Sequence, residues 1–150
     1  MDSVFKKMNF KSSPSVVVVN APTSFGVNMK VMKDFTSFYA DCSLVEKTNF
    51  IIAFCTKQSE VDAVAVQVAE KLAADGLLWF AYPKGTSKKF KCDFNRDTGW
   101  AVLGEQGFEP VRMVAIDEDW SALHFRRVEF IKTMTRSSAI TEAGKERIAK

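Results

Sequence analysis

A loop rich in basic side chains, between residues 84 and 96, is the part of this sequence best suited to chemistry. Five basic residues fall within thirteen positions: Lys84, Lys88, Lys89, Lys91 and Arg96. Ammonium groups, hydroxyls and the free N–H groups of a helix start can together bind an anion. The sequence therefore predicts a site for a phosphate-bearing small molecule. Its expected anion-binding residues are Lys84, Gly85, Thr86, Ser87, Arg96, Thr98 and Gly99.

The same loop has a simpler interpretation as a solvated, lysine-rich connection. No Walker A pattern and no G-x-G-x-x-G pattern occurs in the chain, so the familiar phosphate-binding motifs are missing. Pro83 restrains the backbone beside Lys84, and Gly85 permits the close approach of a ligand. Lys84 is therefore the first candidate for a direct contact. The residues alone leave both interpretations open.

Cys55 is the strongest candidate for a nucleophile. It follows an apolar run and precedes a predicted helix, and the N-terminus of a helix lowers the pKa of a nearby thiol. The residue six positions later is Val61, so the cysteine-to-arginine spacing of a phosphatase loop is missing. No G-x-S-x-G elbow occurs either. Buried, inert thiols are therefore the expectation for Cys55 and for the other two cysteines.

The single histidine and the three scattered cysteines offer no cluster of metal ligands. His124 lies within an apparent strand, so we interpret it as a structural or surface histidine at the edge of the sheet. The acids at residues 117–119 could hold a hard cation through oxygen, but a charged hairpin turn explains them as well. No metal site and no particular cofactor is predicted.

Three runs of consecutive apolar residues predict strands that are buried on both faces. They are Val16–Val19, Phe50–Cys55 and Leu77–Tyr82. Between the second and the third run, apolar side chains recur at helical spacing from Val61 to Leu72. Ser59 is the expected N-cap of this helix, and Asp75-Gly76 is its expected stop. Strand, helix and strand in this order predict a right-handed βαβ crossover.

The remaining segments complete an α/β sandwich. A short helix near Val27–Met32 and a strand near Phe35–Tyr39 are expected, and a second helix runs from Asp97 to Gly107. Residues 111–116 and 121–130 supply the last two strands. The predicted fold is a three-layer α/β/α sandwich, Rossmann-like or flavodoxin-like. Its sheet is mostly parallel, with about five strands and an antiparallel C-terminal edge.

Length and charge bound the organisation of the chain and its partners. The 150 residues carry 21 Lys and Arg against 18 Asp and Glu, a net charge of +3. Residues 1–130 are expected to form one α/β domain with a ragged segment at residues 1–14, and residues 131–150 a basic tail. Residues 126–150 alone hold seven Lys or Arg and three Glu. Because the basic excess lies in this terminal segment, a nucleic-acid partner is not favoured.

The distribution of apolar residues and cysteines indicates the compartment. No apolar run approaches the ~18–20 residues that a membrane span needs. The N-terminal lysines are followed only by the short run Val16–Val19, which is too brief for a signal peptide. The cysteines are odd in number and scattered, which argues against a disulfide framework. A cytoplasmic protein without membrane association is the expectation.

Three segments resemble a bacterial family of small cytoplasmic α/β proteins that is defined only as a domain of unknown function. They are residues 77–84 (LLWFAYPK), 95–100 (NRDTGW) and 111–123 (VRMVAIDEDWSAL). The run Val16–Pro22 is similar to the family's opening strand. The resemblance spans residues 15–130 and implies a bacterial cytoplasmic protein. It brings no established activity, cofactor or catalytic residue.

Two classes of function follow from these residues. No nucleophile–base pair is assembled in the sequence, which favours a non-enzymatic ligand-binding or regulatory module over an enzyme. Its anion site would lie over the carboxyl ends of the strands, where open α/β sheets bind ligands. The alternative is a small enzyme that uses Cys55 or a carboxylate, or an adaptor for a protein partner.

Overall fold

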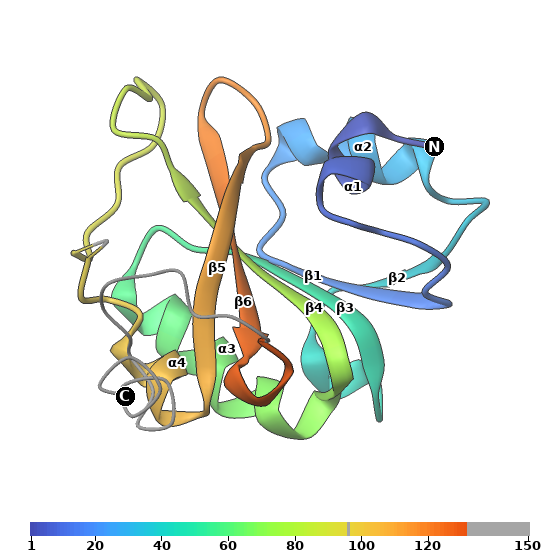
Figure 1. Ribbon diagram of the computed structural model, residues 1–150. Helices are drawn as coiled ribbons and strands as arrows, with labels where there is room; N and C mark the ends of the chain where they lie inside the picture. The colour runs from blue at the N-terminus through green and yellow to red at the C-terminus, as the bar shows by residue number, and fades with distance from the viewer. Residues whose placement is uncertain (96, 132–150) are drawn as a thin grey trace.

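Consecutive apolar residues form the centre of a six-stranded sheet in the computed structural model, which describes residues 1–95 and 97–131 (Figure 1). The strands are β1 (Ser15–Val19), β2 (Ser37–Tyr39), β3 (Thr48–Phe54), β4 (Leu72–Pro83), β5 (Phe108–Ala115) and β6 (Trp120–Arg127). Their order across the sheet is β2-β1-β3-β4-β6-β5. The first four strands pair in parallel, and β6 pairs antiparallel with both β4 and β5.

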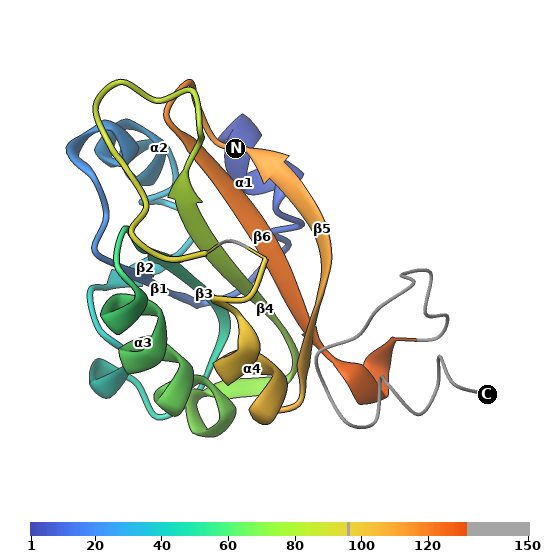
Figure 2. The ribbon, with the colours of Figure 1, turned by 90° about the vertical axis from the view of Figure 1, so that its left-hand side faces the viewer.

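Helices cover both faces of the sheet, so the predicted three-layer α/β/α sandwich is confirmed (Figure 2). The helices are α1 (Ser3–Lys7), α2 (Gly26–Val31), α3 (Gln58–Lys71) and α4 (Ala101–Glu105), with 3-10 turns η1 (Thr23–Phe25), η2 (Cys42–Leu44) and η3 (Val128–Phe130). Successive strand residues face opposite cores. Val17 and Ile51 belong to the core that contains α3 and α4, whereas Val16 and Ile52 belong to the core that contains α1.

The predicted crossover from β3 through α3 to β4 is confirmed. The apolar stripe of α3 is buried at Val61, Val64, Ala65 and Val68. Two details differ from the expectation. The N-cap residue is Lys57 and not Ser59, and Asp75-Gly76 lies inside β4 because the helix already ends at Lys71.

The expectation of a ragged segment at residues 1–14 is wrong. Helix α1 begins after Asp2, whose carboxylate accepts the N–H groups of Val4 and Phe5 at 3.0 and 3.1 Å. Phe5 and Met8 are fully buried, and Phe10 is 4% exposed. These side chains complete the core on one face of the sheet, which is why the segment packs rather than frays.

The C-terminal half differs from the prediction in two respects. The antiparallel pairing is present at this end of the sheet, but β6 lies between β4 and β5, and β5 is the outer strand. The helix expected from Asp97 to Gly107 is shorter, because residues 97–100 form turns and α4 begins at Ala101. In the N-terminal half, the strand expected near Phe35–Tyr39 is confirmed as β2, which has only three residues. Except for Ile131, the basic tail predicted at residues 131–150 lies outside the described residues.

Candidate active site

Four parallel strands deliver their carboxyl ends to one edge of the sheet, and ligands of open α/β sheets bind at this edge. The chain turns to one side after β1, toward β2, whereas β3 lies on the other side of β1. The crevice between the ends of β1 and β3 is therefore the topological switch point of the sheet. The segments that directly follow β1, β2 and β3 surround this crevice. They are residues 20–22, 40–41 and 55–57, in that order.

A hydrogen-bond network fixes the two walls of this crevice. Asn20 has a φ of 56°, a left-handed conformation that asparagine tolerates better than most residues. Its Nδ2 donates to Glu60 Oε2 at 3.1 Å. Glu60 Oε1 accepts hydrogen bonds from the N–H groups of Thr56 and Lys57, at 2.9 and 3.1 Å. The end of β1, the end of β3 and the first turn of α3 are thereby held together.

Asp41 is a candidate site residue that the sequence pattern did not single out. It follows β2 by two positions and is exposed, and its Oδ1 accepts the N–H of Ser43 at 2.9 Å. It also stands 21 residues after Asn20. In dinucleotide-binding sheets an acid about 20 residues after the first turn binds the ribose hydroxyls. This spacing was a usable signal, because a strand was expected near Phe35–Tyr39 and Asp41 follows it by two positions.

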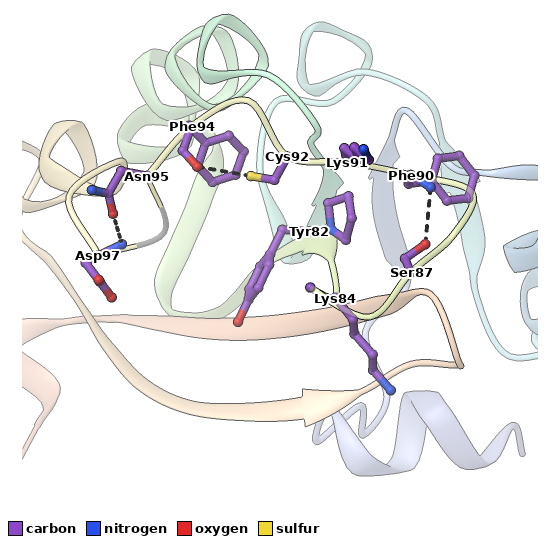
Figure 3. Close-up of a pocket in the computed structure, with 11 residues that line it drawn as sticks. Tyr82, Lys84, Ser87, Phe90, Lys91, Cys92, Phe94, Asn95 and Asp97 are labelled. Carbon is purple, nitrogen blue, oxygen red and sulfur yellow. Dashed lines mark hydrogen bonds between the residues drawn. The ribbon is translucent and has the colours of Figure 1, made fainter.

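A cavity of about 700 Å³ lies beyond the end of β4, within the 300–1,000 Å³ range of small-molecule sites (Figure 3). Its lining residues are Tyr82, Pro83, Lys84, Gly85, Ser87, Phe90, Lys91, Cys92, Phe94, Asn95 and Asp97. Figure 3 shows the loop arching over the end of β4, with Phe94 and Asn95 at one end and Ser87 and Phe90 at the other. The N–H of Asp93 donates to the carbonyl of Thr56 at 2.8 Å, so this loop is joined to the chain just after β3.

The predicted anion-binding residues are only partly brought together. Lys84, Gly85 and Ser87 line the cavity, whereas Thr86, Thr98 and Gly99 do not, and Arg96 lies outside the described residues. The expectation that Thr98 and Gly99 offer free N–H groups is wrong. Both groups donate to the carbonyl of Asn95, at 3.2 and 2.6 Å. The Ser87 hydroxyl also has partners, because it donates to Asp119 Oδ1 at 2.8 Å.

Two of the cysteines, Cys42 and Cys55, have raised pKa values. Burial, followed by the nearby Glu60 carboxylate, raises the pKa of Cys55 above its ordinary range. Both effects disfavour the thiolate, so the environment of Cys55 does not support its use as a nucleophile. Burial likewise raises the pKa of Cys42 to about 11. Cys92 is half-buried at the wall of the cavity.

His124 is a buried residue rather than a surface one. It is 7% exposed on β6, which lies inside the sheet and not at its edge. Its ring stacks on Trp79 with centroids 4.8 Å apart, and neither ring nitrogen has a hydrogen-bond partner among the described residues. Burial lowers the pKa of His124 to about 4, and the positive charges of Arg112 and Arg126 add to this effect. The residue is therefore neutral at pH 7.

The acids at residues 117–119 form the turn between β5 and β6, as the hairpin interpretation predicted. Asp117 Oδ1 accepts the N–H groups of Asp119 and Trp120, at 2.8 and 2.9 Å. Across residues 1–95 and 97–131, no group of three or more His, Cys, Asp or Glu side chains is placed to hold a metal ion. Within the same ranges, no helix is long and apolar enough to cross a bilayer.

Comparisons with solved structures define the class of protein as a Rossmann-like α/β fold that methyltransferases share. A SAM-dependent methyltransferase from Aquifex aeolicus superposes with a TM-score of 0.63 at 13% identity, over 83% of this chain and 88% of that chain. The N-methyltransferase NodS from Bradyrhizobium japonicum WM9 gives a TM-score of 0.52 at 14% identity. The superposition covers 83% of this chain and 93% of NodS. A TehB-like SAM-dependent methyltransferase from Corynebacterium glutamicum gives a TM-score of 0.52 at 10% identity. That superposition covers 83% of this chain and 85% of the other. No protein-family model and no curated protein matches the chain.

These similarities correct the interpretation of function. The expectation of a non-enzymatic ligand-binding or regulatory module is contradicted, because the structures that share this fold over four-fifths of the chain are those of enzymes. The expectation that the chain is not an enzyme is contradicted by the same finding. At identities of 10–14% the similarity establishes the fold, and the activity has to be argued from the site.

Proposed function

We propose that this chain is an S-adenosylmethionine-dependent methyltransferase. Its donor would bind in the crevice between β1 and β3, and its acceptor in the cavity beyond β4. The observation that carries the proposal is the sheet order, with antiparallel β6 between β4 and β5, together with the superposition on the Aquifex aeolicus enzyme. The cavity and the crevice lie at the same edge of this sheet, which is where its ligands are expected.

The residues of the crevice fit an adenosyl ligand in two respects. The left-handed Asn20 makes the sharp turn after β1 that a glycine makes in glycine-rich loops, and exposed Ala21 adds little bulk beside it. Asp41 can accept hydrogen bonds from ribose hydroxyls, because Ser43 uses only its Oδ1. Ser43 is the only residue in the described part of the chain that donates to Asp41.

The chain's own contribution to methyl transfer would be positioning. S-adenosylmethionine, when bound, supplies an electrophilic methyl group. The network of Asn20, Glu60 and Thr56 fixes the walls of the donor crevice, and the hydrogen bond from Asp93 to Thr56 fixes the acceptor loop beside it. Holding two reactants in a near-attack geometry is itself a large part of catalysis in two-substrate reactions. The part of the loop at residues 84–95 also forms a wall of the acceptor cavity and would limit the access of water.

The segments that carry the family resemblance lie near the proposed acceptor cavity, although the resemblance itself implies no activity. Residues 77–84 form most of β4 and its end, and residues 95 and 97–100 lie at one end of the loop. Residues 111–123 form most of β5, the turn after it and the first half of β6. All three segments that carry the resemblance therefore surround the cavity or its supporting strands. Membership of that bacterial family and a cytoplasmic location belong to this proposal as predictions.

Asp41→Asn is expected to weaken the binding of S-adenosylhomocysteine about 10-fold or more. The substitution keeps the shape of the side chain but removes a charged acceptor, and hydrogen bonds to charged groups contribute ~1.5–3 kcal/mol. Isothermal titration calorimetry at constant pH and salt measures the change. Asp34→Asn is the matched control, since Asp34 is an exposed acid before β2 and carries the same charge. Equal affinities in both variants and the wild type would exclude Asp41 from the donor site.

A further inference from the structure

We propose that the cavity beyond β4 binds its methyl acceptor through an anionic group, a carboxylate or a phosphate, held by Lys84 and Lys91. The description of this ligand as a methyl acceptor rests on the proposed function. The inference adds the chemical class of the acceptor. It is carried by three features of the described residues: the cavity itself, the charge of its loop, and the aromatic walls beside the charges.

The charge of the loop is not balanced by its neighbours. Residues 84–91 contain four lysines and no acid. None of these four ammonium groups forms an ion pair or hydrogen bond with a described residue. The nearby acids have other partners, because Asp93 Oδ1 accepts the N–H of Gln58 at 2.9 Å and Asp119 Oδ1 accepts the Ser87 hydroxyl. Asp97 is the one acid among the residues that line the cavity, against Lys84 and Lys91, so the lining keeps a net positive charge. A cleft with a net positive charge attracts and concentrates small anions.

Two of the four lysines are placed at the cavity. Lys84 and Lys91 line it, whereas Lys88 and Lys89 do not. The backbone of Lys84 is held in place, since its N–H donates to the carbonyl of Asp119 at 2.8 Å directly after β4. Figure 3 shows Lys84 leaving the end of the strand, while Lys91 belongs to the part of the loop that passes over it. The two lysines that line the cavity therefore come from different segments of the loop.

The aromatic walls provide a surface for the apolar part of the acceptor. Tyr82 and Phe94 both pack on Trp100, with ring centroids 5.8 and 5.2 Å apart. Phe90 packs on Trp120 at 5.0 Å. Rings supported in this way are rigid, and they favour a flat or apolar body beside the charged group. The expected acceptor is therefore a small organic anion with a ring or a comparable apolar body.

The test uses three probes of one shape: benzoate, phenyl phosphate and the neutral benzamide. Their binding to the full chain is measured by 15N–1H NMR titration at low salt, with Lys84→Ala/Lys91→Ala as the test variant. Lys88→Ala/Lys89→Ala is the matched control, because it removes the same charge from the same loop outside the cavity. At least one anion is expected to bind the wild type in the millimolar range, and benzamide at least 10-fold more weakly. The affinity of the test variant for that anion should fall about 10-fold or more, and the affinity of the control should fall less than 3-fold.

Each other outcome has a definite meaning. An equal loss of anion affinity in both double variants would show non-specific attraction to the charge of the whole loop and would overturn the inference. Equal affinities for benzoate and benzamide would overturn it as well. Preference for benzoate or for phenyl phosphate identifies the anionic group. S-adenosylhomocysteine is titrated into the same samples, and its dissociation constant should change less than 2-fold in either double variant. If the anions bind as expected but S-adenosylhomocysteine does not, the methyltransferase proposal fails and the anion site stands without an acceptor role.

Discussion

Replacing Phe5 with alanine is expected to lower the free energy of unfolding by about 3–5 kcal/mol. Phe5 is fully buried between α1 and the sheet. Its ring packs against Phe10, Phe25, Phe38 and Phe50, with centroids 5.6–6.0 Å apart. The truncation removes apolar contacts to the segment after α1, to η1 and to two strands, and it leaves a cavity that these elements cannot all close. In a chain of this size the melting temperature should fall by about 10 °C.

Lys6→Ala is the control for this substitution. Lys6 is the next residue of the same helix and is exposed, so it tests the effect of changing α1 without touching the core. Urea unfolding of both variants, followed by tryptophan fluorescence, gives the two free energies. If Phe5→Ala unfolds at the same urea concentration as Lys6→Ala, the N-terminal segment does not belong to the core as described above.

Acidification from pH 7 to pH 4 is expected to lower the free energy of unfolding of the wild type by about 3 kcal/mol through His124 alone. The pKa of this residue is about 4 in the folded chain, because of burial and then of Arg112 and Arg126, against 6.5 when unfolded. Between pH 6.5 and about 4, His124 is protonated in the unfolded state but stays neutral in the folded state. The stabilisation from a neutral His124 is therefore complete above pH 6.5 and is lost as the pH falls to about 4. A pKa difference of this size corresponds to about 3 kcal/mol.

His124→Phe isolates this contribution from the titration of the carboxylates. Phenylalanine keeps an aromatic ring over Trp79 but cannot take up a proton. Urea unfolding at pH 7 and at pH 4 gives the loss of stability for each protein, and the wild type should lose about 3 kcal/mol more than the variant. Parallel losses in the two proteins would mean that His124 is solvated in the folded chain.

The parts of the fold that were predictable from the sequence are those with strong local patterns. The continuous apolar runs at Val16–Val19 and Leu77–Tyr82 could only be strands buried on both faces, and the stripe from Val61 to Val68 could only be the helix that covers them. Short elements gave weaker signals. Helix α1 has five residues, too few to display a helical period, so its burial through Phe5 was not predicted.

Long-range features were beyond the sequence for a different reason. The insertion of β6 between β4 and β5 depends on pairings such as Trp79 with His124, which no local pattern reveals. The loop after β4 was correctly expected at the ligand-binding edge, because the rule for parallel strands needs only the strand itself. Its internal hydrogen bonds were not predictable. The turn at Asn95, which takes the N–H groups of Thr98 and Gly99, depends on how the loop folds over the sheet.

A titration of the 15N-labelled chain with S-adenosylhomocysteine, followed residue by residue by NMR, tests the proposed methyltransferase site most directly. Saturable shifts are expected at the amides of Asn20 and Ala21, at Asp41, and at Cys55 and Thr56, because these residues surround the crevice between β1 and β3. Smaller shifts should reach the loop at Asp93 through its hydrogen bond to Thr56. Binding confined to the other edge of the sheet, or no shift at millimolar ligand, would contradict the assignment of this chain as a methyltransferase.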